Sequence, residues 1–534
     1  MKKLTLYILT AFSLIGLTTS CSDFGDVNND PMNLNAGIVD YKMVFTQVEA
    51  QVCGSDWDVW RNGCIYTACM LQHTASVNWS YGGFYTWSDQ YNGAYWTGFY
   101  SGGRAAIRNI IDVMNNWEGM PAYANEYQMC RILKAYMFQI MTDLYGDVPY
   151  FDAGKGYAES PVPYPAYDKQ EDIYNDLLKE LDEAQSSLNA SAPNTIGAAD
   201  VIYGGDAAKW KKFANSLMLR VAMRLTKVAP QTATTWAKKA ISNGLFTSNE
   251  DNAMVKHVGG STSDDSAEPY AKIFASADTQ AFYLSETFIN MLQDDPRLPL
   301  IATVCTKDPQ PGYGAADYDL GDNTPAKQKG MPVGYDVEGG EWDLSKAPGY
   351  PGANWRKVYS LPNRTVYARP DAPSMLVTYA ATQLLLADAA IRGFITDNAE
   401  TYYKNGITAA MKQFSVYEKA SSTIKDSQIS DYLNANPLSS DKETALEQIN
   451  KEYYIHTFCC EYETFANWRR TGYPKLIPAQ RAASYSGNVT NGEIPRRFMY
   501  PTSESTNNPV NYNEAVKRLN GGDKMSSRVW WDKE

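Results

Sequence analysis

The chain has 534 residues and a formal net charge of −12 at pH 7. Removing Lys2 and Lys3 with an N-terminal signal leaves 46 basic and 60 acidic residues, a charge of −14, so we expect no nucleic-acid partner. The three histidines lie far apart and the chain has no CxxC or HExxH motif, which argues against a transition-metal site. We expect neither a cofactor nor a catalytic metal; a structural calcium stays open.

The first 20 residues have the pattern of a secretory signal. Lys2 and Lys3 precede an apolar run over 4–17 that is short for a membrane span, and three small residues then lead into Cys21. Bacterial lipoproteins acylate a cysteine in this place, so we predict a signal peptide over 1–20 and a lipid anchor on Cys21. The alternative is an ordinary secreted protein with a chance cysteine. Residues 21–36 are polar and acidic and are expected to be a flexible tether.

The other cysteines do not form a disulfide framework. They are seven in number, irregularly spaced, and include one adjacent pair, so we expect small buried apolar side chains. They are Cys53, Cys64, Cys69, Cys130, Cys305, Cys459 and Cys460.

Residues 37–534 are predicted to form one mostly α-helical domain. Apolar residues recur at spacings of three and four in several segments, and Asp206 and Asn243-Gly244 have the chemistry of a helix start and a helix stop. The predicted helices cover 126–144, 172–188, 206–225, 232–242, 374–392, 399–414 and 444–465. Pairs of helices joined by short turns suggest tetratricopeptide-like hairpins.

Two regions lack this periodicity. Residues 294–373 and about 480–534 are rich in Gly, Pro, Asp and Tyr. A stretch of that length is more typical of a folded, irregular insertion than of a loose loop. We therefore expect a helical scaffold that carries a large loop-rich, ligand-facing lobe.

Several motifs occur in a fixed order along the chain. They are DLYGDVPY at 143–150, DPRLP at 295–299, QLLLADAAIRG at 383–393 with YYKNGI at 402–407, WRRTGYP at 468–474, IPRR at 494–497 with Tyr500, Pro501 and Glu504, and WWDK at 530–533. Together they resemble the signatures of the SusD/RagB family of outer-membrane lipoproteins, in its SusD-like, starch-binding branch.

This resemblance implies helical pairs with a loop-rich lobe, and a SusC-like TonB-dependent outer-membrane transporter as partner. It implies a glycan ligand, or in some members a peptide. Ser22, Asp23 and Asp26 are similar to the acidic export signal of such lipoproteins, which favours an outer-membrane protein that faces the cell surface.

Ten aromatic residues fall within 79–100. Five of them step by four and are expected to be helix core, namely Tyr91, Tyr95, Trp96, Phe99 and Tyr100. The other five surround Gly82-Gly83 without helical spacing, namely Trp79, Tyr81, Phe84, Tyr85 and Trp87. A sugar ring stacks its C–H face on flat aromatic side chains, so this second set is a candidate ligand platform; simple packing is the alternative. Tyr313, Trp342 and Trp355 of the insertion are further candidates.

Other polar motifs favour structural roles. Arg469-Arg470 and Arg496-Arg497 could bind carboxylates, but internal salt bridges are the stronger expectation. Asp143 and Asp147 resemble turn and cap residues. The acidic pairs Asp264-Asp265 and Asp294-Asp295 are sequence neighbours that generally point apart, and no GxSxG or P-loop motif occurs.

The sequence therefore predicts a lipid-anchored, non-enzymatic protein that captures a glycan and delivers it to a partner transporter. Two alternatives remain: a peptide-binding member of the same family, and a surface glycoside hydrolase.

Overall fold

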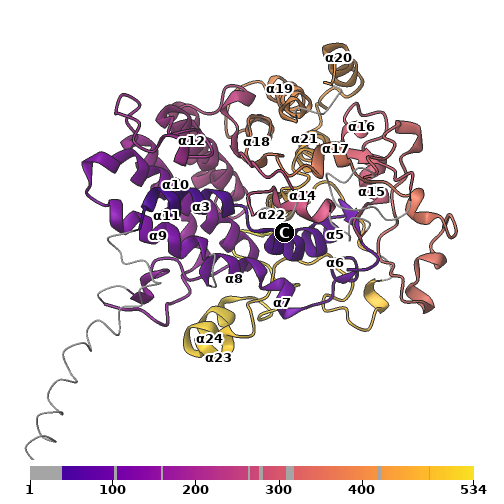
Figure 1. The fold of residues 1–534 in the computed structure, drawn as a ribbon, viewed down its shortest axis with the longest axis horizontal. Helices are drawn as coiled ribbons and strands as arrows, with labels where there is room; N and C mark the ends of the chain where they lie inside the picture. Colours follow the sequence, from indigo (N-terminus) through magenta and orange to yellow (C-terminus); the bar gives the residue numbers. More distant parts are fainter. Residues whose placement is uncertain are drawn as a thin grey trace, which may run out of the picture. The chain divides into compact units, whose positions relative to one another are not determined.

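A computed structural model describes residues 39–101, 105–157, 160–261, 265–275, 281–307, 318–417, 423–479 and 482–534 (Figure 1). The chain divides into Met1–Met43 and Val44–Glu534, and the account below concerns the second unit. The predicted signal peptide, Cys21, the tether and Tyr313 lie outside the described residues. Among the residues that are described, no helix is long and apolar enough to cross a membrane.

Packed helices form most of the unit, which confirms the predicted mostly α-helical class. Successive helices pack along one another in two groups, which meet where α12 of the first packs against α18 of the second (Figure 1). The first group comprises α9 (Ala106–Trp117), α10 (Ala124–Tyr145), α11 (Gln170–Ser187), α12 (Ala207–Arg224) and α13 (Pro230–Asn243). The second comprises α18 (Tyr379–Ile391), α19 (Ala399–Lys412), α20 (Asp426–Ala435), α21 (Lys442–His456) and α22 (Glu461–Thr471).

The central position of α18 follows from its sequence. Every residue from 380 to 389 is buried, and α18 packs against α12, α19 and α21. A helix that is apolar on all sides is stable only when other helices surround it. The motif at 383–393 is therefore the middle of the scaffold.

The predicted helix boundaries at α12 and α13 are confirmed. The Asp206 side chain accepts hydrogen bonds from the backbone N–H of Ala208 (3.0 Å) and Lys209 (3.2 Å), which satisfies two donors at the start of α12. Helix α13 ends at Asn243, and Gly244 follows with φ = 96°, a conformation that costs glycine little.

Two predicted helices are wrong in part. Residues 374–377 form strand β6 (Ser374–Val377), and the helix begins only after Thr378, whose side chain caps it. The predicted helix over 444–465 is broken between His456 and Glu461, because Cys459 has a left-handed backbone with φ = 67°. Apolar spacing continues across both boundaries, so periodicity alone could not locate them.

The loop-rich lobe has short elements and its own core. Its helices are α14 (Pro269–Phe274), α15 (Glu286–Met291), α16 (Leu298–Ile301) and α17 (Arg364–Tyr367). Antiparallel pairs join β1 (Thr74–Ala75) to β3 (Tyr283–Leu284), β2 (Ala253–Val255) to β6, and β4 (Ala302–Thr303) to β5 (Leu361–Pro362). A buried cluster that includes Tyr283, Met331, Tyr335, Trp355 and Tyr359 packs these loops together. The described part of 294–373 is thus a folded insertion, as its composition predicts.

The C-terminal region returns to the scaffold. It contains the 3₁₀ helix η12 (Ala482–Ser484), α23 (Glu504–Asn507) and α24 (Pro509–Arg518), with irregular segments between and after them. Trp531 is 1% exposed, and its indole N–H donates to Asp143 Oδ1 of α10 (3.0 Å). The final residues therefore close the helical core.

Candidate functional site

The site starts on a π-helix. Three consecutive segments are α4 (Asp56–Asp58), the π-helix η1 (Val59–Thr67) and α5 (Ala68–Met70). The Thr67 hydroxyl donates to the carbonyl oxygen of Asn62 (2.8 Å), which supports the widened turn. Trp60 and Arg61 are the half-buried residues of η1, which is otherwise buried. A π-helix is rare and occurs frequently at functional sites, so this segment is a natural place to look for a ligand.

A glycine brings the predicted aromatic segment onto this helix. Helix α6 (Tyr81–Phe84) packs against η1 at Gly82, where an added Cβ would lie 2.4 Å from the carbonyl oxygen of Ile65 and 2.6 Å from that of Tyr66. Only a residue without Cβ permits that approach. Tyr85 then ends α6 in a left-handed conformation with φ = 53°. Helices α7 (Asp89–Asn92) and α8 (Ala94–Tyr100) follow.

The tryptophan cluster, defined as Trp57, Trp60, Trp79, Tyr81 and Tyr91, forms the first aromatic surface. Ring centroids are 5.5 Å apart for Trp57 and Trp60, and 5.0 Å apart for Trp60 and Trp79, in edge-to-face contacts. Tyr91 lies 5.8 Å from Trp60 and 5.2 Å from Tyr81. Trp57 is 52% exposed and the other four rings are half-buried. The cluster thus offers rigid aromatic area to solvent.

The loop cluster, defined as Phe84, Trp342 and Tyr485, is a second aromatic group beside it. Phe84 stacks on Tyr485 with centroids 4.2 Å apart and planes at 17°, and Trp342 contacts both rings at 5.7 Å. Trp342 and Tyr485 are half-buried, whereas Phe84 is 1% exposed. Helix α6 carries both Tyr81 and Phe84, so it joins the two clusters.

Three hydrogen bonds hold the C-terminal loop against α6 and Tyr85. The Asn488 side-chain amide donates to the carbonyl oxygen of Phe84 (2.9 Å), and the Val489 N–H donates to that of Tyr85 (3.1 Å). The Ala479 N–H donates to the Tyr85 hydroxyl (3.0 Å). Three segments far apart in the chain, around 79–91, 340–342 and 479–489, therefore meet at one place.

The predicted ligand residues fall into two classes. Trp79, Tyr81, Trp87 and Trp342 keep exposed surface and are available for contact. Phe84 and Tyr85 are each 1% exposed and Trp355 is 6% exposed; Phe84 and Tyr85 pack beneath the surface, and Trp355 lies in the core of the lobe. Their burial favours the packing role that the sequence left open.

The structure adds residues that sequence reasoning missed. Trp57, Trp60 and Arg61 come from the segment WDVWR, and Tyr485 comes from the C-terminal loop. Tyr91 was expected in a helix core but lies in the tryptophan cluster, half-buried. The density of Trp and Arg in 57–61 is the one sequence signal that could have found the first three.

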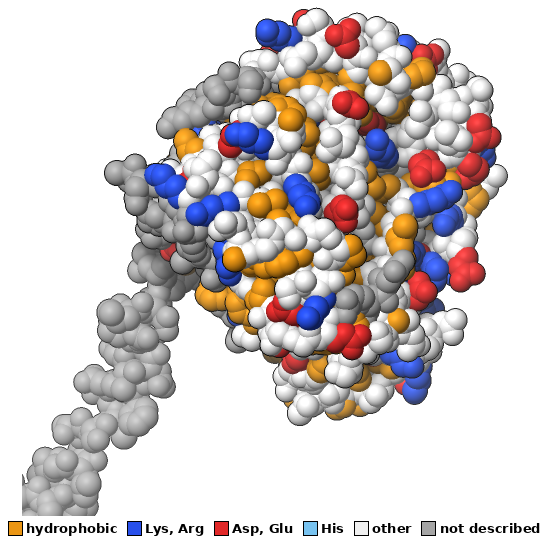
Figure 2. Space-filling model, turned by 90° about the vertical axis from the view of Figure 1, so that its right-hand side faces the viewer, with side chains coloured by type: hydrophobic (Ala, Val, Ile, Leu, Met, Phe, Trp, Pro, Cys, Tyr) orange, Lys and Arg blue, Asp and Glu red, His pale blue; other side chains and the backbone are white. Residues whose placement is uncertain are grey.

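Figure 2 shows the side of the molecule that lies at the right of Figure 1, where the lobe helices α15 and α16 lie. Lys and Arg side chains are interspersed there with Asp and Glu, and apolar patches lie among them. This mixture offers no broad cationic surface for a polyanion, in keeping with the acidic composition.

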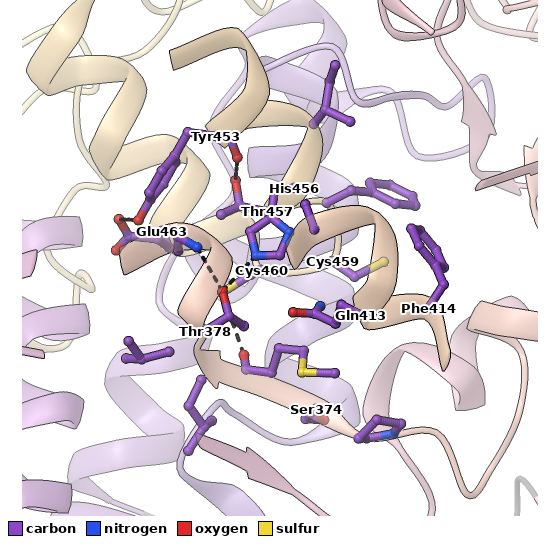
Figure 3. A pocket seen from close by; sticks show the side chains of 18 of the residues that line it. Ser374, Thr378, Gln413, Phe414, Tyr453, His456, Thr457, Cys459, Cys460 and Glu463 are labelled. Atoms are coloured by element: carbon purple, nitrogen blue, oxygen red, sulfur yellow. Dashed lines mark hydrogen bonds between the residues drawn. The ribbon is translucent and has the colours of Figure 1, made fainter. Parts of the chain in front are cut away.

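A cavity of about 80 Å³ is lined by residues of β6, α18, α19 and α21 (Figure 3). His456 and Cys460 line it, and the His456 Nε2 atom is 2.7 Å from the Thr378 hydroxyl. Burial lowers the pKa of His456 to about 3 and raises the pKa of Cys460 to about 12. A neutral imidazole and a protonated thiol do not make an activated cysteine nucleophile.

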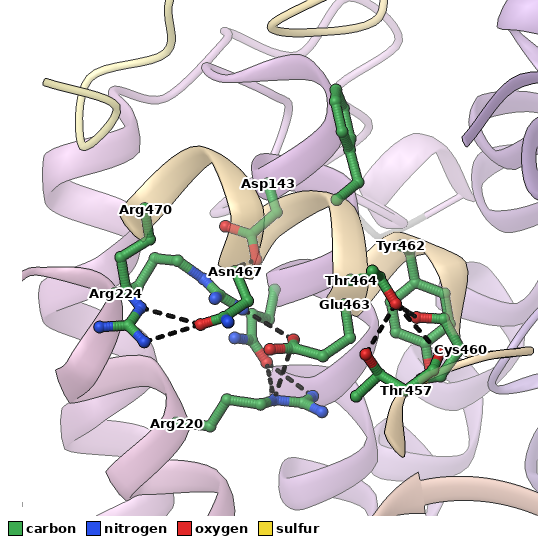
Figure 4. Close-up of polar contacts among 12 residues, drawn as sticks. Asp143, Arg220, Arg224, Thr457, Cys460, Tyr462, Glu463, Thr464, Asn467 and Arg470 are labelled. Carbon is green, nitrogen blue, oxygen red and sulfur yellow. Dashed lines mark hydrogen bonds and ion pairs between the residues drawn. The ribbon is translucent and has the colours of Figure 1, made fainter. Parts of the chain in front are cut away.

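Buried ion pairs tie the helices together near this cavity (Figure 4). Arg224 Nη2 lies 2.7 Å from Glu463 Oε2, and Arg224 Nε lies 3.3 Å from Asp143 Oδ2. Asp143 also accepts a hydrogen bond from the Tyr174 hydroxyl. The prediction that Asp143 is a turn or cap residue is therefore wrong, because it lies in the core and has a cationic partner. Asp147 does accept from the Gln170 N–H (2.8 Å) at the start of α11.

The expectation of internal salt bridges is confirmed for three of the four arginines. Arg470 pairs with Asp388 (3.2 Å), Arg496 with Asp532, and Arg497 with Asp523. Arg469 differs, since it donates to the carbonyl oxygens of Phe465 (3.1 Å) and Arg496 (2.9 Å).

The acidic pairs Asp264-Asp265 and Asp294-Asp295 are not brought together as a catalytic carboxylate pair by any contact among the described residues. Asp295 is buried against Arg297 at 2.6 Å, and Asp264 lies outside the described residues. Within the described part of the chain, no group of three or more His, Cys, Asp or Glu side chains could hold a metal ion.

Comparison with known proteins decides the family. A family model described as "Starch-binding associating with outer membrane", SusD-like, matches residues 39–501. The chain belongs to this SusD-like family. No curated protein matches the sequence.

Solved structures give the same result for the fold. The structure of a chitin-binding protein is 32% identical in sequence and superposes with a TM-score of 0.75. The match covers 92% of this chain and 99% of that one. A Bacteroidetes AC2a SusD-like protein is 30% identical, with a TM-score of 0.78 and coverages of 93% and 100%. A SusD homologue from Bacteroides uniformis is 25% identical, with a TM-score of 0.71 and coverages of 93% and 100%.

Proposed function

We propose that this protein is a lipid-anchored outer-membrane protein that captures a glycan and passes it to a SusC-like TonB-dependent transporter. The tryptophan cluster carries the proposal, because it presents five adjoining aromatic rings that keep exposed surface. Flat rings of this kind suit the C–H faces of sugars. Family membership and the chitin-binding relative support a glycan over a peptide as ligand.

In this mechanism, Trp60 and Trp79 form the platform, and Trp57, Tyr81 and Tyr91 border it. Trp87 and Trp342 extend the contact along the chain of a longer glycan. Binding needs no covalent step, so the protein acts without catalysis, metal or cofactor. A lipid on Cys21 would hold it on the outer membrane, facing outward, where the glycan is met before transport.

The proposal is tested with the purified full-length protein in detergent. Native gels that each contain one polysaccharide, with chitin oligosaccharides as soluble competitors, measure binding, and an assay for new reducing ends measures hydrolysis. Retardation by a glycan without new ends is the expected result. New reducing ends would replace capture by glycoside hydrolysis, and binding only to a peptide mixture would place the protein among the peptide binders.

Partnership with the transporter needs its own test. Cross-linking in cells, followed by purification of the protein, should recover a TonB-dependent outer-membrane transporter. A Cys21→Ala variant should lose the lipid and the membrane fraction, while its gel retardation by glycan stays unchanged.

A further inference from the structure

Arg61 occupies the tryptophan cluster without an anionic partner. Its guanidinium carbon lies 4.9 Å from the ring centroid of Trp57 and 5.8 Å from that of Tyr91. Within the described part of the chain, no carboxylate lies at ion-pair distance from Arg61, and its buried Nε–H reaches no acceptor. The contacts of the guanidinium are therefore with the rings of Trp57 and Tyr91.

Several buried arginines have the carboxylate partner that Arg61 lacks. Arg224 reaches Glu463 at 2.7 Å, and Arg297 reaches Asp295 at 2.6 Å. Buried Arg364 also reaches no carboxylate, but it donates to the carbonyl oxygen of Asp319 (2.6 Å), whereas the Arg61 guanidinium contacts the rings of Trp57 and Tyr91. A buried N–H donor that lacks an acceptor costs free energy until an acceptor arrives.

We propose that Arg61 binds an oxyanion of the captured glycan, so that the site selects acidic sugars. The planar guanidinium can donate two parallel hydrogen bonds to a carboxylate or a sulfate, and such charge-assisted bonds are about twice as strong as those to neutral hydroxyls. Trp57 and Tyr91 fix the orientation of the guanidinium and keep water away from it. The inference rests on the proposed function, since it names the class of glycan that the tryptophan cluster takes.

Arg61 lies where the rings could stack on a sugar while its guanidinium binds the charged group of that sugar. Trp60 precedes it on η1 and contacts Trp79, while Arg61 contacts Trp57 and Tyr91 of the same cluster. An acidic sugar could therefore stack on the rings while its charged group meets the guanidinium. Stacking gives affinity for sugars in general, and the oxyanion contact gives selectivity.

Titration calorimetry on the full-length protein in detergent tests the inference with matched ligands. One pair is oligogalacturonate and its methyl ester, and a second pair is a sulfated oligosaccharide and its desulfated form. We expect one anionic member to bind and its neutral counterpart to bind at least about 10-fold more weakly. A difference in the first pair would identify a carboxylate ligand, and a difference in the second would identify a sulfate ligand.

Substitutions test whether the affinity difference between anionic and neutral ligands depends on Arg61. Arg61→Met should weaken the anionic ligand at least about 10-fold more than it weakens the neutral one, and Arg61→Lys should recover only part of that difference. Arg356→Met is the matched control, because Arg356 also stacks on a tryptophan, Trp355 at 4.4 Å, but that ring belongs to the lobe core. Equal melting temperatures would show that each variant folds.

Two results would overturn the inference while leaving glycan capture intact. One is a neutral glycan that binds equally to wild type and Arg61→Met, with no anionic ligand preferred. The other is an equal loss for charged and neutral ligands in Arg61→Met, which would make Arg61 a support for the rings only. Failure of every glycan to bind would contradict the proposed function itself.

Discussion

Gly82 lies so close to the carbonyl oxygen of Ile65 that an added Cβ would approach it to 2.4 Å. That contact joins the aromatic segment after residue 79 to the π-helix, and so brings Trp79 to Trp60. The arrangement of the tryptophan cluster depends on this one missing side chain.

Gly82→Ala should therefore separate α6 from η1. The added Cβ would meet backbone carbonyl oxygens, which cannot turn aside as the end of a flexible side chain can, so the helix must shift. Glycan affinity should then fall about 10-fold or more, with a moderate loss of stability. Gly83→Ala is the matched control, since an added Cβ there meets only the Gly334 nitrogen at 3.7 Å. Calorimetry and thermal melts check both variants; equal affinity in the two would contradict the role given to Gly82.

The buried pair of Arg224 and Glu463 predicts a strong effect on stability. Glu463→Gln leaves the Arg224 charge in the core with only Asp143 to balance it, so the free energy of unfolding should fall by about 3–5 kcal/mol. The surface variant Glu183→Gln, which loses an exposed contact with Arg131, should cost less than about 1 kcal/mol. Urea unfolding measures both. A small effect at Glu463 would show that the core tolerates the unpaired charge.

The buried Glu268 side chain should make the free energy of unfolding depend on pH. Burial raises its pKa from 4.5 to about 7, so between these values the folded protein keeps a proton that the unfolded chain has released. The contribution of Glu268 to the free energy of unfolding should therefore fall by about 3 kcal/mol as the pH rises from about 4.5 to about 7.

Glu268→Gln removes that titration and should not show the loss. Nearby His257 has a pKa lowered by burial to about 4 and changes stability with the opposite sign, but it is present in both proteins. The difference between wild type and variant, measured by urea unfolding across this pH range, isolates Glu268. A difference that does not change with pH would contradict the prediction.

The effect of Trp342 on glycan affinity should depend on the length of the oligosaccharide. It lies in the loop cluster and contacts Phe84 of α6, the helix that also carries Tyr81 of the tryptophan cluster. Trp342→Ala should weaken long oligosaccharides by about 1–2 kcal/mol and leave disaccharides nearly unchanged, because short ligands occupy only the tryptophan cluster. Calorimetry with a length series measures this. An equal loss at every length would place Trp342 in the primary platform.

Sequence patterns predicted the scaffold because helix periodicity reports directly on buried faces. They failed where a backbone conformation interrupts an apolar run, as at Cys459 with φ = 67° and at β6. The acidic cap Asp206 was predictable because its effect is local.

The site was predicted only in part. Trp79 and Tyr81 stood out beside Gly82-Gly83, but Tyr485 reaches Phe84 from about 400 residues away, which no local pattern reports. Trp60 and Arg61 face the site because a π-helix changes the direction of side chains along η1, and this change has no signature in spacing.

Glycan affinity of Trp60→Ala is the most direct test of the central claim. Trp236, a half-buried tryptophan on α13, supplies the control variant Trp236→Ala. With the glycan that retards the wild-type protein, calorimetry should show an affinity at least about 10-fold lower for Trp60→Ala and unchanged for Trp236→Ala. Wild-type affinity in a folded Trp60→Ala protein would show that the tryptophan cluster is not where the glycan binds.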